Sequence, residues 1–161
     1  MLKTIYNIFM NQWMSIAIKE AMDGINQNDG GPFGAVITRN DSIISTAHNE
    51  VLKSNDPSAH AEVMAIRNAC KHLKTPHLSD CTLYTTCEPC PMCLGAIYWA
   101  RIPTIYYGCT NEDAGKLGFI DQYMHDMFSI QVNDQHKLIQ IDHDACMAVF
   151  DHWKKKDCHL Y

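Results

Sequence analysis

The sequence lacks several features that mark other classes of protein. No run of apolar residues approaches the ~18 residues that a membrane-spanning helix needs, although 47% of the chain is hydrophobic. There is no internal repeat, no low-complexity stretch and no linker, and 161 residues suffice for one domain with its own core. Residues 1–10 carry one lysine and no small-residue cleavage site, which does not match a secretory signal. We therefore expect residues 1–161 to form a single cytoplasmic domain, with residues 1–10 as an N-terminal extension.

Positive charge is also scarce in this chain. Thirteen Lys and Arg residues stand against 18 Asp and Glu residues, and the formal net charge is −5. Nucleic-acid-binding proteins usually carry a basic surface, and here the one dense basic cluster is 154–156. The simpler interpretation of that cluster is a solvated helix end, where cations favour the negative end of the helix dipole. The composition favours a small or weakly charged substrate over a nucleic acid.

Cysteine and histidine, in contrast, are abundant, with eight and nine residues respectively. An even number of cysteines is compatible with disulfides in a secreted protein, but no export signal supports that alternative. Three of the eight cysteines, Cys87, Cys90 and Cys93, lie in one short run. Metal binding or catalysis in a reducing cytoplasm is the better interpretation of that run. Core packing is the expectation for the other five: Cys70, Cys81, Cys109, Cys146 and Cys158.

The hydrophobic periodicity predicts alternating helices and strands. Apolar residues at helical spacing predict helices over Trp13 to the breaker at 30–32, 61–73, 91–100 and 142–156. Short apolar runs predict strands over 33–38, 43–47, 81–86, 104–107 and 137–141. Segments 54–58 and 108–118 are predicted to be loops, the second with a short helix as an alternative. The first two strands form a hairpin in this prediction, which indicates an α/β domain with a mixed sheet covered on both faces.

Two short motifs carry the chemistry of the sequence. His60 and Glu62 form a His-x-Glu pair at the start of the second predicted helix, and Cys90 and Cys93 form a Cys-x-x-Cys pair at the start of the third. A helix N-terminus favours the thiolate form that binds metal. Three protein ligands leave one position of tetrahedral zinc for water, which is typical of a catalytic site. We predict one Zn²⁺ per subunit held by His60, Cys90 and Cys93, with Glu62 as the proton shuttle.

Each motif also has a plainer interpretation. A Cys-x-x-Cys pair by itself is compatible with a redox pair or with half of a structural zinc site, and a His-x-Glu pair by itself means little. An iron–sulfur cluster is a third alternative, because Cys87, Cys90 and Cys93 have the spacing of a ferredoxin run. That run then fails, since residues 94–101 contain no fourth cysteine. The combination of the two motifs in this order favours the catalytic zinc site.

The segments 55–62 (NDPSAHAE) and 86–93 (TCEPCPMC) resemble the cytidine deaminase-like superfamily. Within it, 30–37 (GGPFGAVI) and 93–101 (CLGAIYWAR) are similar to the small bacterial guanine deaminases. The resemblance implies a three-layer α/β/α fold with a five-stranded mixed sheet and the hydrolysis of guanine to xanthine and ammonia. The alternatives are a tRNA adenosine deaminase, another small aminohydrolase acting on cytosine, guanosine or a triazine, and a non-enzymatic zinc-binding module.

The same resemblance gives roles to further residues. It implies that Asn49 holds the purine edge, that Phe33 stacks on the base and that Trp99 walls the pocket. The plain interpretations are a turn asparagine and two packed aromatic residues. Asp121 corresponds to an aspartate that assists proton transfer or holds the amino group, and its plain interpretation is a surface loop residue. The neighbouring Ile120 departs from the family, which often has another acid there.

The resemblance also extends to assembly. It implies a homodimer that exchanges C-terminal segments, so that 142–161 forms a helix and a swapped lid. Tyr161 would then close the pocket of the other subunit, whereas a disordered last residue is the plain alternative. The residues from 134 to 156 diverge from the family pattern.

Overall fold

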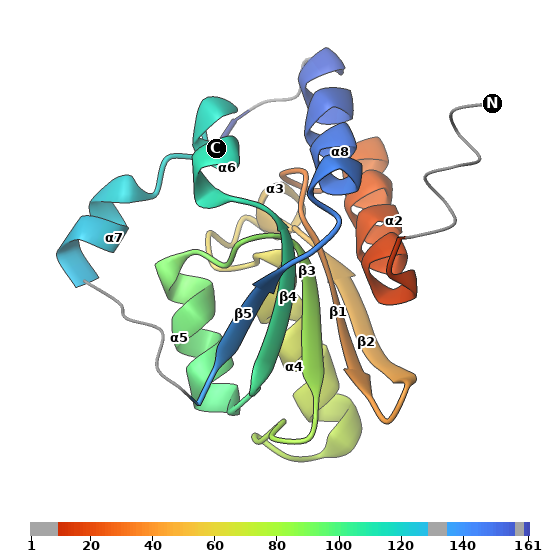
Figure 1. The fold of residues 1–161 in the computed structure, drawn as a ribbon. Coiled ribbons are helices and arrows are strands. Elements are labelled where there is room, and N and C mark those ends of the chain that lie inside the picture. The colour runs from red at the N-terminus through yellow and green to blue at the C-terminus, as the bar shows by residue number, and fades with distance from the viewer. Residues whose placement is uncertain (1–9, 129–134, 157–159) are drawn as a thin grey trace.

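The computed structural model describes residues 10–128, 135–156 and 160–161, and the predicted N-terminal extension lies outside them except for Met10. A five-stranded sheet with the order β2-β1-β3-β4-β5 forms its centre (Figure 1). The strands are β1 (Gly34–Arg39), β2 (Ser42–His48), β3 (Thr82–Cys87), β4 (Thr104–Cys109) and β5 (Lys137–Gln140). The helices are α2 (Gln12–Gln27), α3 (Val51–Ser54), α4 (Ala61–Leu73), α5 (Pro91–Ala100), α6 (Asn111–Lys116), α7 (Gln122–Phe128) and α8 (His143–Lys155).

The sheet is mixed, as predicted. β1 pairs antiparallel with both β2 and β3, whereas β3, β4 and β5 are parallel to one another. Asn40 and Asp41 connect β1 to β2, and both have positive φ angles, 49° and 55°. Two such residues match the twist of a tight hairpin, and Asn and Asp tolerate this conformation best after glycine. The ends of β2, β3 and β4 and the start of β1 consequently lie at one edge of the sheet.

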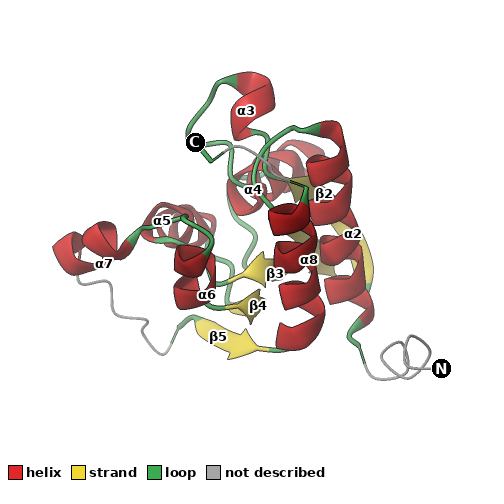
Figure 2. Cartoon of the chain, turned by 90° about the horizontal axis from the view of Figure 1, so that it is seen from above, coloured by secondary structure: helices red, strands yellow, loops and turns green. Residues whose placement is uncertain are grey.

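Helices cover both faces of the sheet, which confirms the three-layer α/β/α fold (Figure 2). α2 and α8 pack on one face of the sheet (Figure 2). Their side chains Met14, Cys146 and Phe150 are buried there in a core shared with the sheet. α4 and α5 pack on the other face over a second core that includes Ile37 and Ile105. None of the helices in the described ranges is both long and apolar enough to cross a bilayer.

The segment after β4 follows the alternative prediction. We predicted a loop over most of 108–118 with a short helix as the alternative, and the structure has that short helix, α6, directly after β4, which extends to Cys109. The Thr110 side chain accepts from the Asp113 backbone N–H, and the Asp113 carboxylate accepts from the Thr110 N–H. This reciprocal capping box stabilises a helix too short to show hydrophobic periodicity. α3 and α7, with four and seven residues, escaped prediction for the same reason.

The last helix is fastened to the first. The Asn11 backbone N–H donates to Asp142 Oδ2 over 3.0 Å, just before α8. At its other end, Lys156 Nζ donates to the Ile25 carbonyl over 2.6 Å and to Asn28 Oδ1 over 3.3 Å. The basic cluster at 154–156 is thus the end of a helix, as predicted, and one of its lysines donates to oxygen atoms at the C-terminal end of α2.

Candidate active site

The three predicted metal ligands meet at the N-termini of two helices. His60 is the N-cap residue of α4, Cys90 is the N-cap residue of α5, and Cys93 lies in the first turn of α5. His60 Nδ1 lies 3.7 Å from Cys90 Sγ and 3.5 Å from Cys93 Sγ. Tetrahedral zinc with ordinary Zn–N and Zn–S bonds requires an N···S separation of roughly 3.6 Å. The His60, Cys90 and Cys93 donor atoms therefore fit a zinc ion.

The charges of this triad also suit a cation. A hydrogen bond from the Cys93 thiol and the neighbouring His60 lower the pKa of Cys90 to about 4, against the effect of burial. The pKa of Cys93 is raised, because it shares its proton with the Cys90 thiolate and is itself buried. Burial lowers the pKa of His60, but its bond to Cys90 outweighs this and raises the pKa overall. A thiolate held beside an imidazole is the donor set that zinc prefers.

Glu62 lies beside the triad on the first turn of α4. Its side chain is buried, with 5% of the residue exposed. Burial, followed by the nearby Cys90 thiolate, raises the pKa of this carboxyl group. A carboxyl group whose pKa moves toward neutrality can both accept and return a proton.

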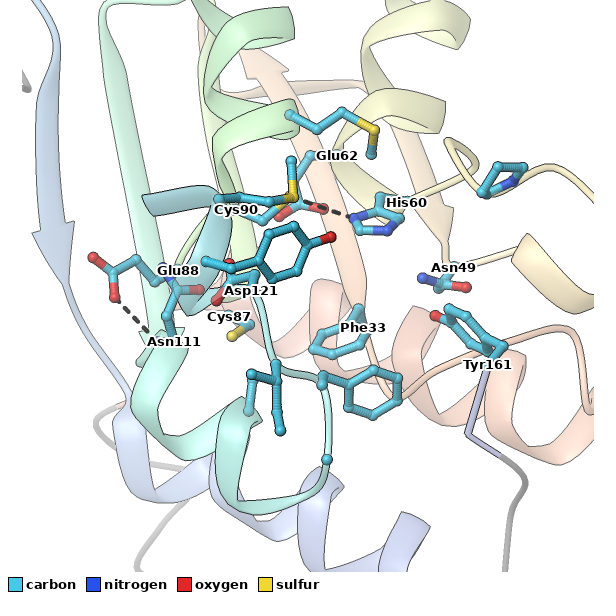
Figure 3. Close-up of a pocket in the computed structure, with 18 residues that line it drawn as sticks. Phe33, Asn49, His60, Glu62, Cys87, Glu88, Cys90, Asn111, Asp121 and Tyr161 are labelled. Atoms are coloured by element: carbon cyan, nitrogen blue, oxygen red, sulfur yellow. Dashed lines mark hydrogen bonds between the residues drawn. The ribbon is translucent and has the colours of Figure 1, made fainter. Parts of the chain in front are cut away.

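His60, Cys90 and Glu62 line a cavity of about 510 Å³, which is within the usual size for a small-molecule site (Figure 3). Four more of the predicted site residues line it: Phe33, Asn49, Asp121 and Tyr161. They come from the start of β1, the end of β2, the residue before α7 and the last residue of the chain. The tertiary structure thus assembles residues that are more than a hundred positions apart in the sequence.

The Asn49 amide is oriented by the backbone around it. Its Oδ1 accepts from the N–H groups of Gly31, over 3.3 Å, and Val51, over 3.1 Å. Its Nδ2 is buried and has no hydrogen-bond partner among the described residues. A side chain on Gly30 would collide with Asn49 Oδ1, so glycine is required there. Asn49 consequently presents at the cavity, beside the Tyr161 hydroxyl, a donor without a hydrogen bond of ordinary length, and a buried donor of this kind is costly without a partner.

Two aromatic residues form one wall of the cavity. Phe33 makes edge-to-face contacts with Phe119 and Phe150, with ring centroids 5.0 and 5.7 Å apart. The Tyr161 ring contacts Phe119, and its hydroxyl end is enclosed near Gly31. Burial raises the pKa of that phenol to about 12. The last residue of the chain therefore lines the cavity of its own chain, in addition to any contact with a second subunit.

Trp99 is the predicted site residue that the structure places elsewhere. It lies on α5 with 84% of its surface exposed and is absent from the lining of this chain's cavity. The sequence pattern also missed Glu88 and Asn111, two polar residues that line the cavity, and His125, which contacts Asn111 but does not line the cavity. The Asn111 backbone N–H donates to the Glu88 carboxylate. Their segments were predicted as loop or not predicted at all, so no periodicity drew attention to them.

Known proteins were compared with this chain. Residues 9–109 match the family described as the cytidine and deoxycytidylate deaminase zinc-binding region. Guanine deaminase of Bacillus subtilis is 54% identical over 109 residues, which cover 68% of this chain and 70% of that protein. A tRNA-specific adenosine deaminase of Buchnera aphidicola is 40% identical over 108 residues, covering 67% of this chain and 71% of that protein.

The likeness extends to three dimensions. The X-ray structure of guanine deaminase from Bacillus subtilis superposes with a TM-score of 0.71 at 41% identity and covers 94% of this chain and 99% of that one. The match of the family model includes both metal motifs, and the His60, Cys90 and Cys93 donors lie together as a zinc site requires. The chain belongs to the cytidine and deoxycytidylate deaminase zinc-binding family.

Proposed function

We propose that this protein hydrolyses guanine to xanthine and ammonia. The observation that carries the proposal is the arrangement of one cavity, in which the His60–Cys90–Cys93 triad and Glu62 face the unused amide donor of Asn49. The 54% identity to a guanine deaminase supports guanine over the adenosine of tRNA, for which the relative is 40% identical. The acidic net charge of −5 points the same way.

The residues divide the reaction between them. Zinc held by His60, Cys90 and Cys93 would polarise a water molecule for attack on C2 of the purine. In this proposal Glu62 takes a proton from that water and transfers it to N3, and a second proton later reaches the amino group through the same carboxylate. The C2–N bond then breaks, ammonia leaves and the oxygen of the water remains on C2. Removing the proton shuttle removes the path for both transfers.

The other cavity residues bind and orient the base. Asn49 Nδ2 donates to an acceptor on the purine edge, because this is the donor that the protein leaves unpaired. The Phe33 ring packs against the face of the base, and its contacts with Phe119 and Phe150 hold it in place. Asp121 lies across the cavity, where its carboxylate accepts from the amino group or assists its protonation.

We also propose that two chains form a homodimer. An exposed tryptophan such as Trp99, at 84%, is unusual on a protein surface and enriched at interfaces. Trp99 would then reach the cavity of the second subunit rather than its own. Tyr161 closes a cavity in this proposal, either that of its own chain, which it lines in the structure, or that of a partner after exchange of C-terminal segments. Residues 1–161 act as one deaminase domain.

A cytoplasmic location completes the proposal. No disulfide joins any of the cysteines in the described part of the chain, which are Cys70, Cys81, Cys87, Cys90, Cys93, Cys109 and Cys146. Many cysteines that form no disulfide are typical of proteins in reducing compartments.

Ammonia release from guanine tests the proposal, with adenine, cytosine, guanosine and a tRNA anticodon stem as parallel substrates. Rapid turnover of guanine alone is the expected result. Turnover of the tRNA stem with a steep fall at higher salt would replace guanine with tRNA, because phosphate contacts release counterions. Bound zinc without ammonia release from any substrate would support a non-enzymatic zinc-binding module.

A further inference from the structure

The Asp121 carboxylate is bonded to a histidine on its own helix. Asp121 immediately precedes α7, and its backbone carbonyl accepts from the N–H groups of Met124 and His125, over 2.8 and 3.2 Å. Its Oδ2 lies 3.1 Å from His125 Nε2, and the two side chains are 22% and 30% exposed. Figure 3 shows the carboxylate in the cavity, on the wall opposite Asn49 and Tyr161. The histidine therefore holds the one acidic group of the proposed reaction that is not on α4.

The bond between Asp121 and His125 replaces another conformation that is open to an aspartate at this position. An aspartate at the position before a helix ordinarily bends its carboxylate back to accept from N–H groups of the first turn. In that conformation it would cap α7 and would not be held at the cavity by a second side chain. The bond to His125 fixes the Asp121 carboxylate at the cavity wall. The Asp121 side chain therefore has less rotamer freedom left to lose when substrate binds.

His125 is itself anchored by Asn111, which lies on the same wall of the cavity as Asp121 (Figure 3). Its Nε2 lies 3.2 Å from Asn111 Nδ2, and the Asn111 backbone N–H donates to Glu88 Oε2 over 3.1 Å. The Glu88 backbone N–H in turn donates to the Cys109 carbonyl over 2.8 Å. The chain of contacts runs from the segment between β3 and α5, through the start of α6, to α7. α7 is thereby tied to the rigid end of the sheet.

The positions of the hydrogen atoms decide which group donates to Asp121. A carboxylate only accepts, so the bond to Asp121 requires a hydrogen on His125 Nε2. One ring nitrogen cannot at the same time accept from the Asn111 amide. The side-chain amide of Asn111 must then be turned so that its oxygen, and not its nitrogen, faces the same N–H. The hydrogen-bond pattern determines this orientation of the amide. His125 thus donates to the carboxylate, with the oxygen of Asn111 as a second, weaker acceptor.

We propose that His125 is a positioning residue for this deaminase, which holds the Asp121 carboxylate toward the amino group of the bound purine. The inference rests on the proposed function. His125 does not contact the reacting atoms in this account, and its effect passes entirely through Asp121. Substitution of His125 should therefore change kcat rather than substrate binding. It should have no further effect in a protein whose Asp121 has been replaced by Asn.

The first test compares His125→Leu with His125→Gln in the full-length, zinc-loaded protein with guanine as substrate. We expect kcat to fall about tenfold to a hundredfold in His125→Leu, with KM changed by about twofold at most, since a displaced catalytic group slows the reaction without releasing the base. A Gln amide can donate near the position of Nε2, and His125→Gln should restore most of kcat. The control is Gln122→Ala, which removes an exposed bond of the same spacing, Gln122 Nε2 to Asp126 Oδ1 at 2.9 Å, from the same helix.

The second test is a double-mutant cycle with Asp121→Asn. If His125 acts through Asp121, adding His125→Leu to Asp121→Asn leaves kcat unchanged, whereas a merely structural histidine lowers kcat by the same factor in both backgrounds. Zinc content and melting temperature of each variant identify loss of metal or of fold. Full kcat in His125→Leu or in Asp121→Asn, or equal losses in both backgrounds, would overturn the inference while guanine turnover by the wild type still supports the proposed function. A wild type that releases no ammonia from guanine overturns both.

Discussion

Two groups of metal-ligating residues occur in the described part of the chain, and only one of them suits a metal. His60, Cys90 and Cys93 form the first, which we call the triad, and Asp29, His48 and Glu50 form the second, which we call the acidic group. In both, the possible ligand atoms lie within 4.8 Å of one another. Proximity of donor atoms is therefore not what distinguishes them.

The acidic group already contains its cations. Lys53 Nζ lies 3.1 Å from Asp29 Oδ2 and 3.0 Å from Glu50 Oε1, so an ammonium group lies between these carboxylates. His48 Nε2 lies 2.8 Å from Asp29 Oδ2, and its Nδ1 lies 3.4 Å from Glu20 Oε2. The bonds to Glu20 and Asp29 raise the pKa of His48 in spite of its burial, which favours the protonated ring. Both ring nitrogens of His48 therefore already lie against carboxylates, and neither is free to bind a metal.

The thiolate of the triad has no lysine partner among the described residues. It is paired within the described residues with the Cys93 thiol and with His60, and it faces a cavity rather than a lysine. The comparison shows that a metal site needs donors whose charge the protein itself leaves uncompensated. In the sequence Asn49 lies between His48 and Glu50 of the acidic group, but its side chain belongs to the cavity, because neighbouring residues of an extended chain point to opposite sides.

The largest effect is expected from Cys90→Ala. Removing one of three ligands should reduce the zinc content from about one ion per chain to near zero and abolish turnover. The loss of zinc that is present at about 100 times its Kd also costs about 2.7 kcal/mol of stability. Metal analysis, ammonia release and thermal unfolding measure the three effects. Cys70→Ala, at a half-buried thiol outside the triad, is the matched control. Full zinc content in Cys90→Ala would remove Cys90 from the ligand set.

Glu62→Gln should separate metal binding from proton transfer. We expect zinc to stay bound and kcat to fall by about 10²–10⁴-fold, the usual contribution of a general acid–base group. Glu112→Gln, at an exposed glutamate of α6, should change neither quantity. Turnover of Glu62→Gln close to that of the wild type would rule out Glu62 as the proton shuttle.

Asn49→Ala tests the cavity residue that stands between His48 and Glu50 in the sequence. We expect kcat/KM for guanine to fall about tenfold, since the substrate loses one hydrogen bond of about 1.4 kcal/mol. Stability should fall as well, because the N–H groups of Gly31 and Val51 lose their acceptor. Steady-state kinetics measure the change in kcat/KM. The control is Asn68→Ala, at an exposed asparagine of α4, which should leave kcat/KM unchanged. Unchanged kcat/KM would show that Nδ2 does not bind the base.

Lys53→Met addresses the acidic group directly. Lys53 is 49% exposed, so solvent screens its ion pairs and the expected loss of stability is about 0.5 kcal/mol. Zinc content should remain at about one ion per chain in the wild type and in Lys53→Met. Thermal unfolding and metal analysis of the same samples measure both. A second zinc ion in the wild type would contradict the distinction between the two groups.

The pH dependence of the acidic group gives the smallest predicted effect. Because the pKa of His48 is raised in the folded protein, its contribution to stability is fully present below about pH 6.5 and is lost as the pH rises through the folded pKa. The pKa of Asp29 is lowered, since its bonds to His48 and Lys53 outweigh burial, so this contribution is present above about pH 4. The difference in melting temperature between the wild type and His48→Gln should therefore be largest near pH 5–6 and shrink toward pH 8.5. A difference that grows over this range would contradict a raised pKa.

Much of the fold was predictable from the sequence because its signals are local. The hairpin at Asn40 and Asp41, the helix that starts at Pro91 and the order of strands and helices all depend on neighbouring residues, and the structure confirms them. In the segment from 108 to 128, a short helix was predicted only as an alternative to a loop, and α7 was not predicted, since α6 depends on one capping box and α7 is only two turns long. Short helices of this kind form through contacts with the rest of the molecule rather than through periodicity.

The sequence by itself determined the zinc site and its chemistry, because the ligand types and their spacing at two helix starts admit few alternatives. Only the tertiary structure decided which neighbours complete the site. It placed Tyr161 beside Asn49 and His125 on Asp121, it left Trp99 exposed, and it gave the acidic group its lysine. The physical reason is that a metal motif is local along the chain, whereas hydrogen bonds, burial and charge compensation arise between segments that only folding brings together.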